Sequence, residues 1–155
     1  MELLGNRIKK NYELSAKHRL TRRIPVIIRV DGQAFHTLAY ELKWPFDDDF
    51  HDHMTISAME SAVNMQGFAL AYVQSDEASF LLTDYSALET EAWFDYTKSK
   101  LESITASRMT AYFNYRSNYS RFGYFDARAF NIPREEVVNY FLWRAKDWER
   151  NSLQM

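Results

Sequence analysis

The sequence contains no cysteine and few of the residues that interrupt regular structure. Only four glycines and three prolines are spread over its 155 residues. Without cysteine the chain forms neither disulfides nor thiolate metal sites. No apolar run approaches the roughly 20 residues that span a bilayer, and residues 1–18 lack the apolar stretch of a signal peptide. These absences predict a cytoplasmic protein with no membrane partner.

Apolar and aromatic residues are, in contrast, plentiful. Hydrophobic residues make up 46% of the chain, which excludes a disordered polymer. There are 11 Phe, 10 Tyr and 4 Trp, enough large side chains to build a substantial core. Because repeats, low-complexity segments and flexible linkers are lacking, we expect residues 1–155 to form a single domain.

Charge is unevenly distributed along the chain. Residues 1–23 carry seven basic and two acidic side chains, a balance of +5, so the remainder of a chain with net charge −2 sums to −7. A basic N-terminal arm ahead of an acidic body is typical of a protein that binds a polyanion beside a metal centre. A solvated helical face explains the arm equally well.

The spacing of apolar residues predicts alternating strands and helices. Val26, Ile28 and Val30 share one face of the first expected strand, and Arg29 and Asp31 lie on the other. Residues 111–116 and 122–131 are both rich in Tyr and Phe, and at least the second run reads as a strand. The predicted strands cover 24–31, 68–74, 78–83 and 122–131, and the predicted helices cover 48–66, 88–109 and 134–155.

This order, β-α-β-β-α-β and then α, predicts an α+β fold of the ferredoxin-like (split βαβ) kind, an antiparallel sheet with helices on one face. In that fold the first two strands are parallel and the third lies between them. The end of the first strand at Asp31 should therefore meet the turn Ser75-Asp76-Glu77, which is distant in sequence.

Two aspartates brought together in this way repel each other unless a cation lies between them. Magnesium prefers hard oxygen ligands and usually takes one or two carboxylates. We expect Asp31 and Asp76 to supply these, the Gly32 carbonyl to be a further ligand, and Glu77 to be an outer acid. Arg29 lies on the strand face of Asp31 and could reach phosphates, and further candidates for a triphosphate are Lys43, Lys98 and Lys100.

Each motif also has a purely structural interpretation. Asp-Gly is a common turn dipeptide, and Ser75-Asp76-Glu77 could be an ordinary polar hairpin loop. Similarly, the acidic and histidine-containing run 47–53 is best explained as a helix start, because His51 and His53 would point about 200° apart. In the stretch 112–128, aromatics alternate with arginines; such residues suit single-stranded RNA, but they more often form a core.

Two segments together resemble the signature motifs of the tRNA-His guanylyltransferase superfamily: "IIRVDGQAFHTL" and "AYVQSDEASFLL". Later blocks match in order and spacing, among them "AWFDYTKSK" and "FDARAFNIP". The start "LTRRIPVIIRVDG" and the ending "RNSLQM" are most similar to its bacterial, archaeal and phage branch. Gln33 stands where the family usually has a basic residue, and family members continue beyond the position of Met155, so the resemblance predicts a C-terminally shortened form.

The resemblance implies a polymerase-like palm that adds nucleotides to the 5′ end of a tRNA in the 3′→5′ direction, with GTP and ATP as substrates. It implies tRNA repair or tRNA-His guanylylation and a homo-oligomer, a dimer or tetramer. Two Mg²⁺ ions would bind at Asp31, Gly32 and Asp76, with Glu77 supporting catalysis. The expected nucleotide-binding residues are Arg29, Asp31, Gly32, Gln33, Ala34, Phe35, His36, Ser75, Asp76 and Lys100.

Two other functions remain open from the residues alone. A palm-type cyclase or transferase that uses only small nucleotides employs a similar acidic pair. A non-catalytic module would bind nucleotide or tRNA without turnover. In the cyclase-like function, the basic N-terminal arm has no evident role.

Overall fold

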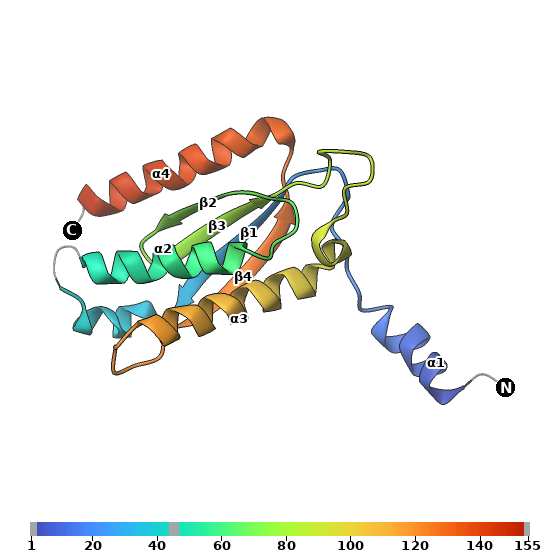
Figure 1. The fold of residues 1–155 in the computed structure, drawn as a ribbon, viewed down its shortest axis with the longest axis horizontal. Coiled ribbons are helices and arrows are strands. Elements are labelled where there is room, and N and C mark those ends of the chain that lie inside the picture. The colour runs from blue at the N-terminus through green and yellow to red at the C-terminus, as the bar shows by residue number, and fades with distance from the viewer. Residues whose placement is uncertain (1–2, 44–46, 154–155) are drawn as a thin grey trace.

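The computed structural model describes residues 3–43 and 47–153. One four-stranded sheet lies between α4 on one side and α2 and α3 on the other, and α1 projects away from this body (Figure 1). The helices are α1 (Leu4–Ile8), α2 (Asp48–Ala62), α3 (Lys98–Arg116) and α4 (Val137–Leu153); the strands are β1 (Val26–Gln33), β2 (Phe68–Gln74), β3 (Glu77–Leu82) and β4 (Tyr124–Asn131). Short helical turns are η1 (Lys9–Glu13), η2 (Phe35–Thr37), η3 (Ala39–Glu41), η4 (Trp93–Tyr96) and η5 (Arg134–Glu136).

The strands lie in the order β2-β3-β1-β4, and every neighbouring pair is antiparallel. Because β1 and β2 both run antiparallel to β3, they are parallel to each other with β3 between them. This is the arrangement predicted from the order of elements, and it confirms the α+β, ferredoxin-like fold class.

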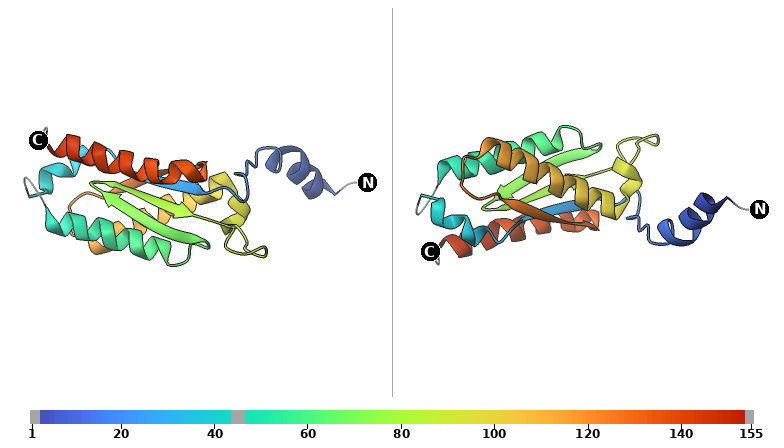
Figure 2. Two further views of the ribbon diagram at one scale, coloured as in Figure 1. Left: turned by 90° about the horizontal axis from the view of Figure 1, so that it is seen from above. Right: turned by 90° about the horizontal axis from the view of Figure 1, so that it is seen from below.

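Both faces of the sheet are covered, which corrects the expectation of helices on one face. Val26, Ile28 and Val30 are fully buried in the core beneath α2 and α3. On the opposite face Ile27 packs with Leu81, and Tyr140 of α4 completes this smaller cluster (Figure 2). Since β1 and β3 carry apolar residues on both faces, a helix is needed on each side to keep them from water.

The second long helix begins at Lys98, not near residue 88 as predicted. The preceding residues Phe94, Asp95 and Tyr96 have φ angles of 49°, 51° and 47°, a left-handed run that no right-handed helix accommodates. The aromatic run 111–116 is the end of this helix, because its buried residues follow an i+4 spacing throughout: Leu101, Thr105, Met109 and Phe113.

Helix α2 begins as predicted, and it ends earlier. The Asp47 side chain accepts a hydrogen bond from the Phe50 backbone N–H at 2.8 Å, which caps the helix. The helix stops at Ala62, ahead of the expected Gly67. Gly67 has a φ of +77°, and a Cβ there would lie 2.1 Å from the Thr83 carbonyl oxygen, so glycine is required where β2 starts beside the end of β3. No helix within 3–43 and 47–153 is long and apolar enough to cross a membrane.

Candidate active site

The end of β1 and the turn between β2 and β3 meet at one end of the sheet, as the topology predicts. Asp31 is directly opposite Glu77 in the ladder between β1 and β3. The Gly32 backbone N–H donates a hydrogen bond to the Asp76 carbonyl oxygen at 3.0 Å. The two motifs are therefore joined through the backbone and occupy a fixed position.

Gly32 is required for this close approach. A Cβ at this position would lie 2.4 Å from Cδ2 of Phe35 and 2.8 Å from Oδ2 of Asp76. Either distance is shorter than real Cβ contacts allow, so a side chain would displace the Asp76 carboxylate. The glycine of the motif thus lets Asp76 lie directly against β1.

The carboxylates of this site influence one another. Burial raises the pKa of Asp76 above its ordinary value, and the nearby Asp31 carboxylate raises it further. Burial also raises the pKa of Glu77, while the Arg144 guanidinium opposes that effect. A divalent cation would relieve the repulsion between Asp31 and Asp76.

The donor set suits magnesium better than a metal that needs many protein ligands. Residues 3–43 and 47–153 contain no group of three or more His, Asp or Glu side chains arranged to hold a metal. Magnesium commonly uses one or two carboxylates and takes its other ligands from water and substrate phosphates. Asp31, Asp76 and the Gly32 carbonyl fit that requirement. His51 and His53 belong to no such group, and His53 packs edge-on against Phe113 and Tyr119.

Glu77 is buried and engaged by arginines. Its two carboxylate oxygens accept hydrogen bonds from Nε and Nη2 of Arg144, each at 2.8 Å. Arg29 is also close to this carboxylate, with its Nε 4.0 Å from Oε2 of Glu77. The Arg29 side chain is 17% exposed, so the arginine predicted to reach phosphates lies mainly beneath α4 beside Glu77.

Of the residues that follow Asp31, some are exposed at the edge of the site and one is buried in the core. Gln33 and Ala34 are exposed, and so is Ser75, whose hydroxyl donates to Oδ1 of Asp76 at 3.2 Å. Phe35 is instead a core residue, with its ring 5.0 Å from that of Phe125. Its side chain is therefore unable to stack on a nucleotide, although it was predicted to line the site. The side chain of His36 lies outside the described part of the chain.

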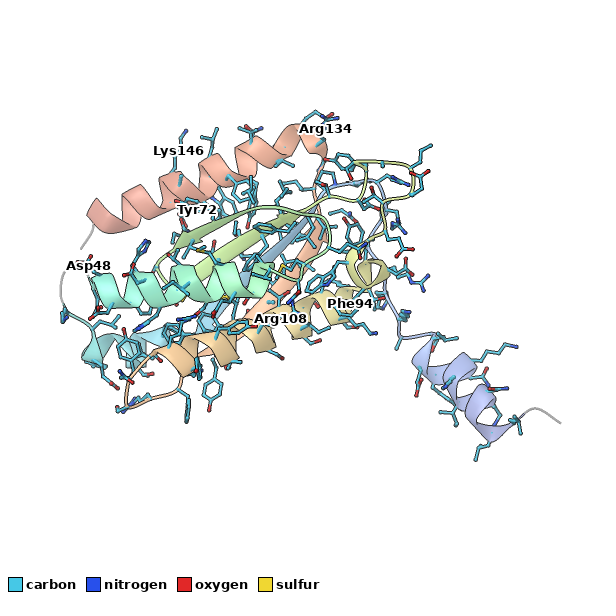
Figure 3. All side chains as sticks on the ribbon, viewed as in Figure 1. Asp48, Tyr72, Phe94, Arg108, Arg134 and Lys146 are labelled. Carbon is cyan, nitrogen blue, oxygen red and sulfur yellow. The ribbon has the colours of Figure 1, made fainter. Side chains whose placement is uncertain are left out.

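Lys100 is not brought to the carboxylates. It lies on the first turn of α3, with Nζ 5.3 Å from the Phe94 ring centre. That end of α3 is beside the end of β4, since Glu102 accepts a hydrogen bond from the Ala129 N–H. Asp31 pairs with Asp126, near the other end of β4. Figure 3 accordingly shows Phe94 near the end of the molecule from which α1 departs, and Asp48 at the opposite end.

The other two lysine candidates are paired with acids. Lys98 lies 3.5 Å from Glu102 within α3, and Lys43 lies 3.2 Å from Asp49 ahead of α2. Neither contact involves the residues of the acidic centre.

The basic arm divides into an anchored part and an exposed part. Arg22 binds Asp84, and Arg23 donates to the backbone carbonyls of Asp84, Ala87 and Leu88. These two arginines fasten the arm to the loop after β3. Arg19 pairs with Asp95 at 2.9 Å. The basic residues nearer the N-terminus are exposed: Arg7, Lys9, Lys10 and Lys17.

Sequence reasoning missed Arg144, and it considered Arg128 only as part of the aromatic and arginine-containing stretch 112–128. Arg128 is opposite Arg29 in the ladder between β1 and β4, and it is exposed near Asp31. Arg144 lies on the face of α4 that packs on the sheet, together with Tyr140. A charged residue at an apolar helix position was the available signal for Arg144, because such a residue needs a buried partner.

Comparisons with known proteins identify relatives of this chain. Residues 6–133 match the family of tRNAHis guanylyltransferases. A probable tRNA(His) guanylyltransferase of Dictyostelium discoideum is 30% identical over 145 residues, which cover 86% of this chain and 54% of the relative. The chain spans about half the length of the curated relatives it matches.

Two solved structures are similar over almost the whole chain. A bacterial tRNA(His) guanylyltransferase-like protein in complex with GTP matches with a TM-score of 0.93 and 40% identity, covering 98% of this chain and 69% of that one. A structure of such a protein in complex with ATP gives a TM-score of 0.94 and 40% identity, covering 99% and 69%.

Proposed function

The chain belongs to the tRNA-His guanylyltransferase family, and from that membership we propose that it adds nucleotides to the 5′ end of a tRNA in the 3′→5′ direction. The 5′ monophosphate would first be activated with ATP. Activation would join the AMP part of ATP to this phosphate and release pyrophosphate. The 3′-hydroxyl of an incoming GTP or other nucleoside triphosphate would then attack the activated phosphate and release AMP. The product is a 5′-extended tRNA, formed in tRNA repair or in guanylylation of tRNA-His.

One observation carries the proposal: Asp31 and Asp76 are placed together by the ends of rigid strands. We assign two Mg²⁺ ions to Asp31, Asp76 and the Gly32 carbonyl. Bound there, magnesium would polarise the phosphate oxygens and favour ionisation of the attacking hydroxyl. The fixed backbone contact between Gly32 and Asp76 holds both carboxylates in place before substrate arrives.

The surroundings of this pair suit nucleotide and RNA. Exposed Gln33, Ala34 and Ser75 form a rim that a triphosphate could approach, and Arg128 offers a nearby guanidinium. On the first residues of β4 and the loop before it, Phe122 is 71% and Tyr124 56% exposed. Exposed rings beside arginines suit the stacking of unpaired bases.

The test is an extension assay with magnesium, ATP, labelled GTP and a 5′-monophosphorylated tRNA that lacks its first nucleotide. We expect the label to enter the 5′ end of the RNA. Asp31→Ala and Asp76→Ala should abolish the product, whereas Asp126→Ala, which removes an exposed carboxylate opposite Asp31, should retain it. Activity in either of the first two variants would refute the assignment of the metal ligands.

The same assay separates this function from its alternatives. A cyclic nucleotide formed from GTP or ATP without RNA would indicate a cyclase-like enzyme. Triphosphate binding without any product, in a chain shown to be folded by circular dichroism, would indicate a binding module. Either result would contradict the proposed reaction.

We also propose that the protein forms a homo-oligomer. β2 is an edge strand whose Phe68 and Leu70 are 40% and 41% exposed. Met59 of α2, Val63 directly after α2 and Leu142 of α4 are exposed as well, and the two helices lie on either side of this strand (Figure 1). An unpaired edge strand with apolar neighbours suits pairing with a second copy.

A further inference from the structure

The turn that presents Asp76 has an unfavourable backbone conformation. Gln74 and Glu77 are opposite each other in the ladder between β2 and β3, so Ser75 and Asp76 alone form the turn. Ser75 has a φ of 48°, in the left-handed region that two-residue hairpins usually fill with glycine or asparagine. Such a conformation persists when the surrounding structure holds it in place.

Arg144 of α4 contacts both residues that flank this turn. Its Nε and Nη2 donate to the two carboxylate oxygens of Glu77, each at 2.8 Å. When the Gln74 side-chain amide is oriented with its oxygen toward the guanidinium, Nη2 of Arg144 also donates to that oxygen at 2.7 Å. The Gln74 amide nitrogen then donates to the Arg144 carbonyl oxygen at 2.6 Å. One guanidinium thus joins the two strands at the base of the turn.

These contacts are enclosed and specific. Gln74, Glu77 and Arg144 are each 8% exposed, so their hydrogen bonds are shielded from water. Two parallel N–H···O bonds between arginine and a carboxylate fix orientation as well as distance. Arg144 is itself positioned by Asp147, 3.3 Å away, and by the ring of Trp143.

We infer that Arg144 is a positioning residue for the acidic centre: it holds the Ser75-Asp76 turn in the geometry that places the Asp76 carboxylate beside Asp31. In this arrangement both oxygens of Glu77 accept hydrogen bonds from Arg144, so Glu77 anchors the turn to α4. The catalytic part of this inference depends on the proposed function; the cation-binding part depends only on the structure.

α4 provides a matched control. The Tyr140 hydroxyl hydrogen-bonds to Ser79 at 2.8 Å in the same buried layer. This contact also joins α4 to β3, but it does not touch the turn. Loss of the Tyr140 hydroxyl should therefore weaken the packing of α4 without moving Asp76.

The experiment compares Arg144→Lys with Tyr140→Phe. Lysine keeps the charge and cannot bind both Glu77 oxygens and Gln74 at once. In the extension assay we expect Arg144→Lys to lower kcat on the order of 10- to 100-fold, the cost of a misplaced catalytic group, with little change in the KM for GTP. Tyr140→Phe should leave kcat unchanged. Equal kcat in wild type and Arg144→Lys, or equal loss in both variants, would overturn the inference.

A second measurement does not need turnover. Mn²⁺ binding, followed by electron paramagnetic resonance without nucleotide, should be weakened in Arg144→Lys and unchanged in Tyr140→Phe. If wild-type protein binds Mn²⁺ in this way and adds no nucleotide, the proposed function fails while the positioning inference stands. Unaltered Mn²⁺ affinity in Arg144→Lys overturns the inference. Should that variant not fold, Gln74→Met, which leaves the ion pair intact, is expected to weaken Mn²⁺ binding in the same comparison.

Discussion

At the scale of single residues, the site depends on a glycine as much as on its carboxylates. Gly32 has no unusual φ angle; its importance lies in the space its missing side chain leaves for Phe35 and Asp76. The same short segment therefore supplies Phe35 to the core and Asp31 to the candidate active site. A change at Gly32 should affect stability and activity together.

We expect Gly32→Ala to destabilise the protein by about 1–3 kcal/mol, the usual cost of overpacking, and to abolish nucleotide addition. Urea unfolding followed by circular dichroism, together with the extension assay, measures both effects. Gly5→Ala is the matched control, since a Cβ at Gly5 has no atom within 4 Å. Wild-type stability and activity in Gly32→Ala would show that this close approach has no role.

At the scale of elements, α2 shows how an acidic cluster can serve structure. The Asp47 carboxylate accepts the backbone N–H groups of Lys43 and Phe50, each at 2.8 Å. Partial burial alone would raise its pKa, but these hydrogen bonds, the Lys43 charge and the Asp49 backbone N–H together outweigh burial and lower the pKa. The cluster at 47–53, which resembles a metal site by composition, is thus a helix start as predicted.

Asp47→Ala should therefore lower the free energy of unfolding by about 1 kcal/mol near neutral pH. Because the pKa of Asp47 is lower in the folded chain, its contribution is present above the unfolded value of about 3.9. The contribution is lost as the pH falls through the folded pKa. Urea unfolding of both proteins from pH 7 to pH 3 should show the two curves converging at acid pH. A difference that stays constant with pH would contradict this role.

At the scale of the whole molecule, the two ends of the sheet carry different groups of functional residues. One end carries Asp31, Asp76 and the exposed rings of Phe122 and Tyr124. The opposite end carries the start of α3 with Lys100 and the attachment of the basic arm at Arg22. The basic arm and the acidic centre of one chain therefore lie at opposite ends of the sheet.

Leu70→Glu should shift the oligomer toward monomer, because it places a charge on the exposed edge strand β2. Size-exclusion chromatography with light scattering measures the change in mass. Leu88→Glu serves as control, since Leu88 is 86% exposed and lies in the loop after β3, outside β2. A mass equal to that of the wild type would exclude the β2 edge as the interface.

The sequence by itself determined the strand order and the meeting of Asp31 with Ser75-Asp76-Glu77. Alternating apolar residues and the order of elements are local patterns, and the connection rules of split βαβ folds convert them into neighbours in space. The same local patterns gave the wrong start for α3, because they predicted a helix from residue 88 onward. Three left-handed residues within 88–97 exclude a helix there.

Only the tertiary structure decided which candidates surround the acidic pair. Phe35 is buried in the core, because residues that are close in a motif can point to opposite faces. Lys100 lies at the far end of the sheet, because the start of α3 is there. Arg144, 67 residues from Glu77, joined the site through a buried ion pair. The helical period places Arg144 on the apolar face of α4, but the identity of its buried partner depends on how the helix docks on the sheet.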